Sequence, residues 1–132
     1  MNEFRTAIEA GDFDAIGDLL ADDVVFRSPV AFKPYEGRAI VHAIIRGVSR
    51  VFEDFRYVRE LHDDDGHALI FETRVGAVSL NGCDFLRLDA DGRISELTVM
   101  VRPLSAANAL AEAMSAQFDQ IQAEAMAAMS EK

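Results

Sequence analysis

Cysteine, proline and lysine are scarce in this sequence, and long apolar runs are absent. The single cysteine, Cys83, cannot form an internal disulfide, which favours a reducing compartment. No apolar run approaches the roughly 20 residues that a membrane-spanning helix needs. The first residues, Met1–Arg5, lack the basic and then apolar build of a signal peptide. The sequence therefore predicts a cytoplasmic protein.

Positive charge is also in short supply. The chain has 23 acidic and 13 basic residues and a net charge of -10. Only Lys33 and Lys132 are lysines, and the arginines are scattered along the chain without forming a basic stripe. Such an acidic surface repels phosphate backbones and anionic lipids. We therefore expect neither nucleic acid nor a membrane to be a partner.

The chain has 132 residues, half of them apolar, which is enough to bury a core without disulfides or a structural metal. It contains no internal repeat and no low-complexity linker. We expect one domain over residues 1–132, in which residues 104–129 form an appended C-terminal helix.

The N-terminal segment predicts two short helices followed by a strand. Gly11 is suited to end the first helix in a left-handed cap, and Asp12 to cap the second. Asp22 and Asp23 are expected to form an acidic turn that breaks the second helix. Residues 24–28 are rich in β-branched and aromatic side chains, which favours a strand. Residues 29–37 are expected to form a loop.

Residues 38–52 have the period of a helix, with His42 on the side opposite the apolar stripe and therefore expected to be exposed. The period then changes to two. The sequence predicts strands at residues 55–61, 68–80, 83–88 and 93–102, with a hairpin turn at Asn81–Gly82. Residues 104–129 predict a helix about 39 Å long, which covers a pocket mouth or packs on a second subunit. This order suits an α+β fold, in which a curved antiparallel sheet wraps around a long helix.

Four segments, in this order and spacing, carry a resemblance to a known family: Gly11–Ile16, Ala21–Val24, Gly37–Ile40 and Asp84–Ile94. Over about residues 1–103 the chain resembles the nuclear transport factor 2-like superfamily and, within it, the SnoaL-like and ketosteroid isomerase-like group. The resemblance implies a cone-shaped α+β barrel with an apolar cavity, commonly in a homodimer. It implies no single function, because the superfamily includes isomerases, hydrolases, dehydratases, cyclases and non-enzymatic binding modules.

Asp84 is the candidate catalytic residue. Strand alternation places it on the same face as Leu86 and Leu88, and burial on an apolar face raises the pKa of a carboxyl. The resemblance implies a protonated aspartic acid here, which donates a hydrogen bond to a substrate oxyanion. The structural alternative is that Asp84 satisfies a backbone or arginine partner inside the barrel.

Two other positions depart from the isomerase pattern. Ser28 occupies the position that resembles the proton-shuttling aspartate, and a serine hydroxyl does not act as that base unaided. Phe4 occupies the position of the oxyanion-hole tyrosine and has no hydroxyl to donate. Steroid isomerisation by that mechanism is therefore not expected. Ser28 is expected to end its strand before Pro29 or to offer a ligand one hydrogen bond.

Strand and helix alternation also predicts the walls of a cavity that suits a hydrophobic ligand. The alternative is that these side chains fill the core and leave no cavity. The inward positions are Val24, Phe26, Ile44, Leu69, Phe71, Leu97, Val99 and Val101, with Thr73 as the polar exception.

Other candidate sites carry less weight. The segment His62–His67 is rich in potential metal ligands, but three aspartates and a glycine between two strands indicate first a solvated turn. Asp89–Gly92 is similar to the start of a calcium loop, but the twelfth position is Met100 instead of glutamate. No nucleophilic triad or phosphate-binding glycine loop is visible. We expect no metal and no cofactor.

These observations lead to a main hypothesis and two rivals. The main one is a pocket protein for a small hydrophobic molecule, which as an enzyme would be an isomerase, cyclase or lyase. The first rival is a non-enzymatic dimeric module that senses a ligand or binds a protein, motivated by the Ala/Met-rich C-terminal helix. The second is a hydrolase with paired carboxylates, which needs a second acid near Asp84. An enclosed cavity with Asp84 in its wall favours the main hypothesis. A filled barrel with an apolar groove along the last helix favours the first rival.

Overall fold

The chain begins with two short helices, α1 (Glu3–Ala10) and α2 (Phe13–Leu19), in the computed structural model, which describes residues 2–130. Gly11 adopts a left-handed conformation after α1, with φ of 66°, as its sequence position predicted. The side chain of Asp12 accepts a hydrogen bond from the backbone of Ala15 at 3.1 Å and caps α2. The predicted caps at Gly11 and Asp12 are confirmed.

Strand β1 (Leu20–Arg27) follows α2 directly, so the predicted turn at Asp22 and Asp23 is wrong. Both aspartates are exposed within β1, where its pairing with β6 (Ile94–Arg102) is irregular between Leu20 and Val25. The side chain of Asp22 pairs with Arg38 at 2.8 Å. An irregular strand thus keeps both carboxylates in water without needing a turn.

Within the predicted loop, Tyr35–Glu36 forms a short strand, β2, that pairs antiparallel with β1. Helix α3 (Arg38–Val51) then runs close to its predicted bounds. His42 is half-buried instead of exposed, because its Nε2 atom lies 2.7 Å from the carbonyl oxygen of Phe13 and its ring packs against Gly17. The position of α2 on α3 therefore buries a side chain that the helical pattern alone places on the polar side.

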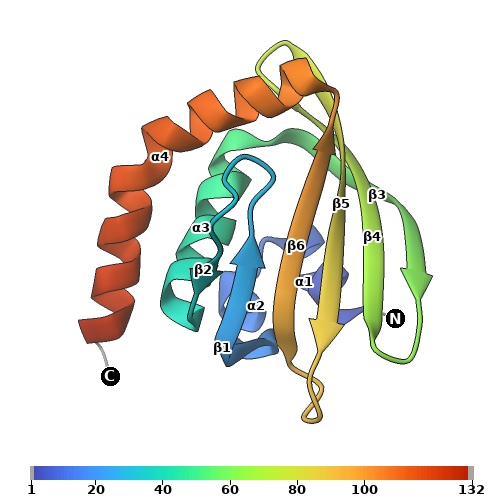
Figure 1. Ribbon diagram of the computed structural model, residues 1–132, viewed down its shortest axis with the longest axis vertical. Coiled ribbons are helices and arrows are strands. Elements are labelled where there is room, and N and C mark those ends of the chain that lie inside the picture. Colours follow the sequence, from blue (N-terminus) through green and yellow to red (C-terminus); the bar gives the residue numbers. More distant parts are fainter. Residues whose placement is uncertain (1, 131–132) are drawn as a thin grey trace.

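The remaining strands are β3 (Glu53–His62), β4 (Gly66–Val75) and β5 (Val78–Leu88), followed by β6. They form the predicted antiparallel meander, and β1 pairs parallel with β6. The sheet order is β2-β1-β6-β5-β4-β3, so β2 and β3 are the edges of an open, curved sheet. Figure 1 shows α1, α2 and α3 packed against one side of it. The fold is α+β, as expected.

The hairpin between β4 and β5 is displaced from its predicted position. The turn lies at Gly76 and Ala77, and Asn81–Gly82 lies inside β5. Gly76 has a positive φ of 59°, which suits a tight turn. Gly82 serves a packing need, since a Cβ atom there would lie 2.2 Å from Cζ of Phe71. An Asn-Gly pair inside a strand therefore gave a false turn signal.

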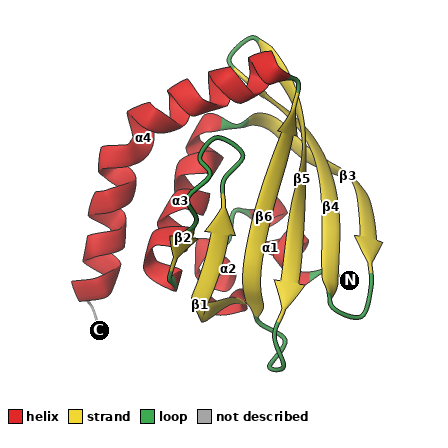
Figure 2. Cartoon of the chain, viewed as in Figure 1, coloured by secondary structure: helices red, strands yellow, loops and turns green. Residues whose placement is uncertain are grey.

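Helix α4 (Leu104–Ser130) confirms the long C-terminal helix. It crosses one end of the sheet and then turns down beside α3 (Figures 1 and 2). Ile121 is buried against α3 where Gly47 has no side chain. Arg50 donates hydrogen bonds from α3 to Gln117 at 2.7 Å and Glu124 at 2.9 Å. In residues 2–130, no helix combines the length and apolar character needed to cross a membrane.

Candidate functional site

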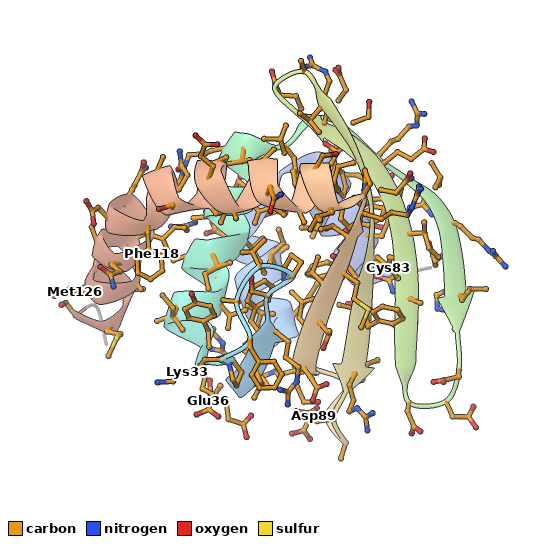
Figure 3. The ribbon with its side chains drawn as sticks, turned by 45° about the horizontal axis from the view of Figure 1, so that its top comes forward. Lys33, Glu36, Cys83, Asp89, Phe118 and Met126 are labelled. Atoms are coloured by element: carbon orange, nitrogen blue, oxygen red, sulfur yellow. The ribbon has the colours of Figure 1, made fainter. Side chains whose placement is uncertain are left out.

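A cavity of about 350 Å³ lies between the concave face of the sheet and the helices α1, α3 and α4. Its walls are mostly apolar, and its residues come from widely separated parts of the chain. Helix α4 covers it and supplies six of the lining side chains, so the predicted covering role of this helix agrees with the geometry. These six are Leu110, Ala111, Met114, Ser115, Phe118 and Ile121. In Figure 3, α4 passes over the other helices, and Phe118 is labelled near its bend.

Asp84 lies in the wall of this cavity, on the inward face of β5. It is buried on the same face as Leu86, as strand alternation predicted. Burial disfavours its charged form and raises its pKa to about 7. At neutral pH both protonation states are therefore populated. Among the cavity-lining residues that the structure describes, Asp84 is the only carboxylic acid.

Tyr57 on β3 is the hydrogen-bond partner of Asp84. Its hydroxyl donates to Oδ2 of Asp84 at a distance of 2.8 Å, and this bond partly offsets the effect of burial on the pKa of Asp84. Burial, followed by the negative charge of Asp84, raises the pKa of Tyr57 far above its ordinary value. Tyr57 therefore remains a donor at all physiological pH values. The guanidinium of Arg5 lies 5.7 Å from the centre of the Tyr57 ring.

Three phenylalanines form an aromatic cluster beside Tyr57. The ring of Phe55 meets Tyr57 edge-on at 4.9 Å between centres, and Phe71 meets it edge-on at 6.2 Å. Phe52 stacks on Phe55 at 5.9 Å. These rings make the surroundings of Tyr57 apolar, and a low local dielectric strengthens any hydrogen bond that a ligand makes there.

Most of the predicted site residues lie together around the cavity. Those that line it with Asp84 are Phe4, Phe26, Ser28, Ile44, Phe71, Leu97 and Val99. Ser28 also ends its strand, because its hydroxyl oxygen accepts a hydrogen bond from the backbone of Val30 at 3.1 Å. Whether these residues contact a ligand stays a prediction.

Four predicted wall residues do not line the cavity. Val24 is fully buried in the core on β1. Leu69 is fully buried in the core on the strand beside Asp84. Thr73 turns its hydroxyl to the backbone carbonyl of Glu53 at 2.7 Å, and Val101 lies opposite Gly82 near the end of β6. Alternation identifies the inward face of a strand, but it does not say how far the cavity extends along that face.

The sequence interpretation missed Tyr57 and Tyr35, both of which line the cavity. Tyr57 lies two residues after Phe55 in β3 and therefore on the same face of the strand, and this alternation could have identified it. Its contact with Asp84 depends on β4 lying between β3 and β5, and this pairing is not encoded locally. Tyr35 packs between Phe26 and Phe118, with ring centres 6.3 and 6.5 Å away, and comes from a segment predicted to be a loop.

The rejected candidates have simple structural roles. Oδ1 of Asp63 accepts hydrogen bonds from the backbones of Asp65 and Gly66, at 2.8 and 2.9 Å, which makes the predicted turn. Oδ1 of Asp89 holds its own turn in the same way. Cys83 is half-buried, and burial raises the pKa of its thiol, which makes it a poor nucleophile.

The comparison with known families agrees with this geometry. The model of the SnoaL-like domain matches residues 1–97. The chain belongs to the SnoaL-like family. Its fold is that of the nuclear transport factor 2-like proteins, as the resemblance of its motifs implied.

Two solved structures are similar to this SnoaL-like chain in sequence as well as in fold. A steroid delta-isomerase from Pseudomonas aeruginosa is 43% identical, has a TM-score of 0.86, and aligns over 92% of this chain and 90% of its own. An uncharacterised protein with a cystatin-like fold from Silicibacter pomeroyi DSS-3 is 35% identical, has a TM-score of 0.83, and aligns over 87% and 82%.

A SnoaL-like polyketide cyclase, so described provisionally, from Shewanella denitrificans OS-217 shares the fold at 15% identity, with a TM-score of 0.64 over 83% of this chain and 93% of its own. No protein with a curated description matches this SnoaL-like chain. A protein described as an isomerase is thus similar in sequence, the cyclase shares the fold alone, and neither shows the activity of this chain.

Proposed function

We propose that this protein binds a small hydrophobic molecule in its cavity and that Asp84 exchanges a hydrogen bond or a proton with an oxygen or carbon atom of that molecule. One observation carries the proposal: a carboxyl group with a pKa of about 7 lies in the wall of an apolar cavity. A general acid or base is most effective when its pKa is close to the working pH. A cavity with Asp84 in its wall supports this hypothesis over a filled barrel.

As an enzyme, the protein is proposed to be a cofactor-independent isomerase, cyclase or lyase. With a single cavity carboxyl, the same group removes a proton from one carbon of the substrate and returns it at another position. Tyr57 keeps its hydroxyl on Asp84 throughout and stabilises the carboxylate that is present before the proton is taken and restored when the proton is returned. A two-carboxyl mechanism is not supported, because Ser28 stands where the resemblance implies a second carboxylate.

The test combines binding with turnover. Calorimetry with apolar cyclic ketones measures binding, and the ultraviolet absorbance of the conjugated product follows the shift of a β,γ-unsaturated ketone. We expect Asp84→Asn to bind such ketones with similar affinity and to lose turnover by about 10²-fold or more. Cys83→Ser is the matched control, because Cys83 is the neighbouring residue but does not line the cavity. Equal turnover by Asp84→Asn and the native protein would disprove the role of Asp84.

A non-enzymatic binding module is the second candidate. Met126 and Met129 are 68% and 64% exposed on the last turns of α4, and Met126 is labelled at the far end of this helix in Figure 3. Exposed methionines suit adaptable protein contacts. Saturable binding of apolar cyclic ketones, with no turnover of any β,γ-unsaturated ketone tested, would favour this candidate.

The homodimer stays a proposal. The convex face of the sheet carries the exposed side chains of Val58, Phe85 and Met100, and we propose that a second copy of the chain covers them. Sedimentation analysis of Met100→Glu and Phe85→Glu tests this. Native protein that sediments as a dimer while both variants sediment as monomers supports it, and a native monomer overturns it.

A further inference from the structure

Two histidines face each other at the end of the β3–β4 hairpin, away from the residues around Asp84. His62 and His67 are directly opposite in the strand register. Their rings are nearly perpendicular, at 83°, with centres 4.5 Å apart, and the two Nδ1 atoms are in contact. Nothing in the proposed function uses this pair.

The turn between these histidines holds them in position. The backbone N–H of Asp63 donates to the carbonyl oxygen of Gly66 at 3.0 Å, and the Asp63 carboxylate accepts from two further backbone groups. Gly66 packs so closely on β5 that a Cβ atom there would lie 1.9 Å from the carbonyl oxygen of Leu86. The hairpin end is thus fixed to the sheet, and the facing of the two imidazoles is built into the backbone.

The other ring nitrogen of His62 has a carboxylate partner. Nε2 of His62 lies 2.7 Å from Oε2 of Glu60, so this nitrogen carries the proton in the neutral ring. Nδ1 of His62 then carries a lone pair that points towards Nδ1 of His67. Arg5 holds Glu60 in turn, with 2.9 Å between Nη1 and Oε1. A carboxylate on the outer nitrogen of an imidazole is the arrangement that orients histidine ligands on metals.

The surroundings suit a cation. A second surface hollow of about 350 Å³ is lined by both histidines, by three acids, Asp63, Asp65 and Glu96, and by one arginine, Arg87. The side chains of these aspartates, and the net charge of -10, favour accumulation of cations there. Imidazole nitrogen is a preferred ligand of Zn²⁺, Cu²⁺ and Ni²⁺, whereas Ca²⁺ and Mg²⁺ prefer oxygen.

We propose that His62 and His67 form a binding site for a divalent transition metal of the imidazole-preferring class, with Glu60 as the group that orients His62. The two Nδ1 atoms move apart to admit the ion, which takes the place of a proton shared between them. No group of three ligating side chains is placed to share an ion within residues 2–130, so water molecules complete the coordination. The bound ion links the ends of β3 and β4, and the site is open to solvent on one side.

The test uses the full-length, metal-free protein and the metals alone. Calorimetry with Zn²⁺ and Ni²⁺ is expected to show one saturable equivalent per chain. His67→Gln and His62→Gln are expected to weaken it at least tenfold, and Glu60→Gln to weaken it by a smaller factor. Asp64→Asn is the matched control, because Asp64 is an exposed acid on the same turn. Circular dichroism confirms that each variant is folded.

Nuclear magnetic resonance of the imidazole nitrogens provides a second readout that does not depend on the variants. One equivalent of Zn²⁺ is expected to shift the Nδ1 resonances of His62 and His67 and to leave those of His42 unchanged. Either of two results overturns the proposal: binding of Zn²⁺ that Asp64→Asn weakens as much as His67→Gln, or Nδ1 resonances that do not move. The first indicates a diffuse acidic surface, and the second indicates a pair that holds only its shared proton.

Discussion

The hydroxyl of Tyr57 donates a hydrogen bond to Asp84 across β4, at 2.8 Å, and joins two residues that are 27 positions apart in the sequence. This bond has opposite consequences for its two partners. It stabilises the carboxylate of Asp84, while the nearby negative charge makes Tyr57 harder to ionise. The pair therefore has one proton that exchanges near neutral pH and one that stays in place.

Removal of the donor is expected to raise the pKa of Asp84. Tyr57→Phe deletes the hydroxyl that holds this pKa down against burial, so the pKa should move above about 7. Carbon-13 magnetic resonance of the Asp84 carboxyl during a pH titration measures it. Tyr35→Phe is the control, because it removes a hydroxyl that lines the same cavity without contacting Asp84. An unchanged pKa in Tyr57→Phe would contradict the proposed hydrogen bond.

Asp84 should make the protein less stable as the pH rises. Its pKa is raised from 3.8 to about 7 in the folded state, so below pH 4 both states are protonated and the group has no effect. Between about pH 4 and 7 the unfolded chain loses the proton first, which lowers the free energy of unfolding by up to about 4 kcal/mol. Above pH 7 this effect is constant.

Urea unfolding of the native protein and Asp84→Asn measures this effect. The native protein should lose stability relative to the variant between pH 4 and 7, and the difference should be level from pH 8 upward. A constant difference over the whole range would show that the pKa of Asp84 is not raised.

Gly82→Ala is expected to destabilise the protein through Phe71. The new Cβ atom would lie 2.2 to 2.8 Å from three atoms of a rigid ring, which must shift towards Phe55 and Tyr57. Overpacking of this kind costs about 1 to 3 kcal/mol. Phe71→Leu in the same chain should recover part of the loss. Ser79→Ala, at an exposed position on β5, should have no effect on urea unfolding.

Gly47 and Ile121 should show strong coupling. In the native protein Ile121→Val removes a buried methyl group and is expected to cost about 0.5 to 1.5 kcal/mol. In Gly47→Ala the new Cβ atom lies 2.6 Å from Cδ1 of Ile121, and valine lacks that atom. The same Ile121→Val change should therefore stabilise Gly47→Ala. Equal effects in the two backgrounds, measured by thermal unfolding, would show that α4 does not dock on Gly47.

Ser28→Asp is expected to increase proton transfer. It places a second carboxyl at the cavity wall, where Ser28 now provides only a hydroxyl. Because a positioned general base contributes about 10²- to 10⁴-fold, the shift of a β,γ-unsaturated ketone should accelerate at least tenfold. Ser49→Asp is the control for added charge at another serine of the cavity lining. Equal rates in the two variants would argue against a special position for residue 28.

The sequence patterns predicted the elements well and their contacts less well. The helical period found α3 and α4 to within a residue or so, because both bury one continuous face. Asp84 was found because a carboxylate stands out on an apolar strand face. These signals are local, so they can be recognised without knowledge of the tertiary structure.

Other features depended on pairings that no local pattern encodes. Gly82 is a glycine because of Phe71, on the neighbouring strand, and its sequence context indicated a turn instead. Tyr57 matters because the sheet order brings it within reach of Asp84. His42 is half-buried only because α2 packs on α3. In each case the missing information was the identity of a partner distant in sequence.

The helix that covers the cavity and the acid in the cavity wall lie in different parts of the chain. The residues that match the SnoaL-like domain, 1–97, contain both Tyr57 and Asp84, whereas the helix that roofs the cavity lies entirely outside them. Substitutions in α4 can therefore change the shape of molecule that is admitted while the acid and its partner stay fixed. Under the proposed function, binding specificity can thus vary through α4 without any change at Asp84 or Tyr57.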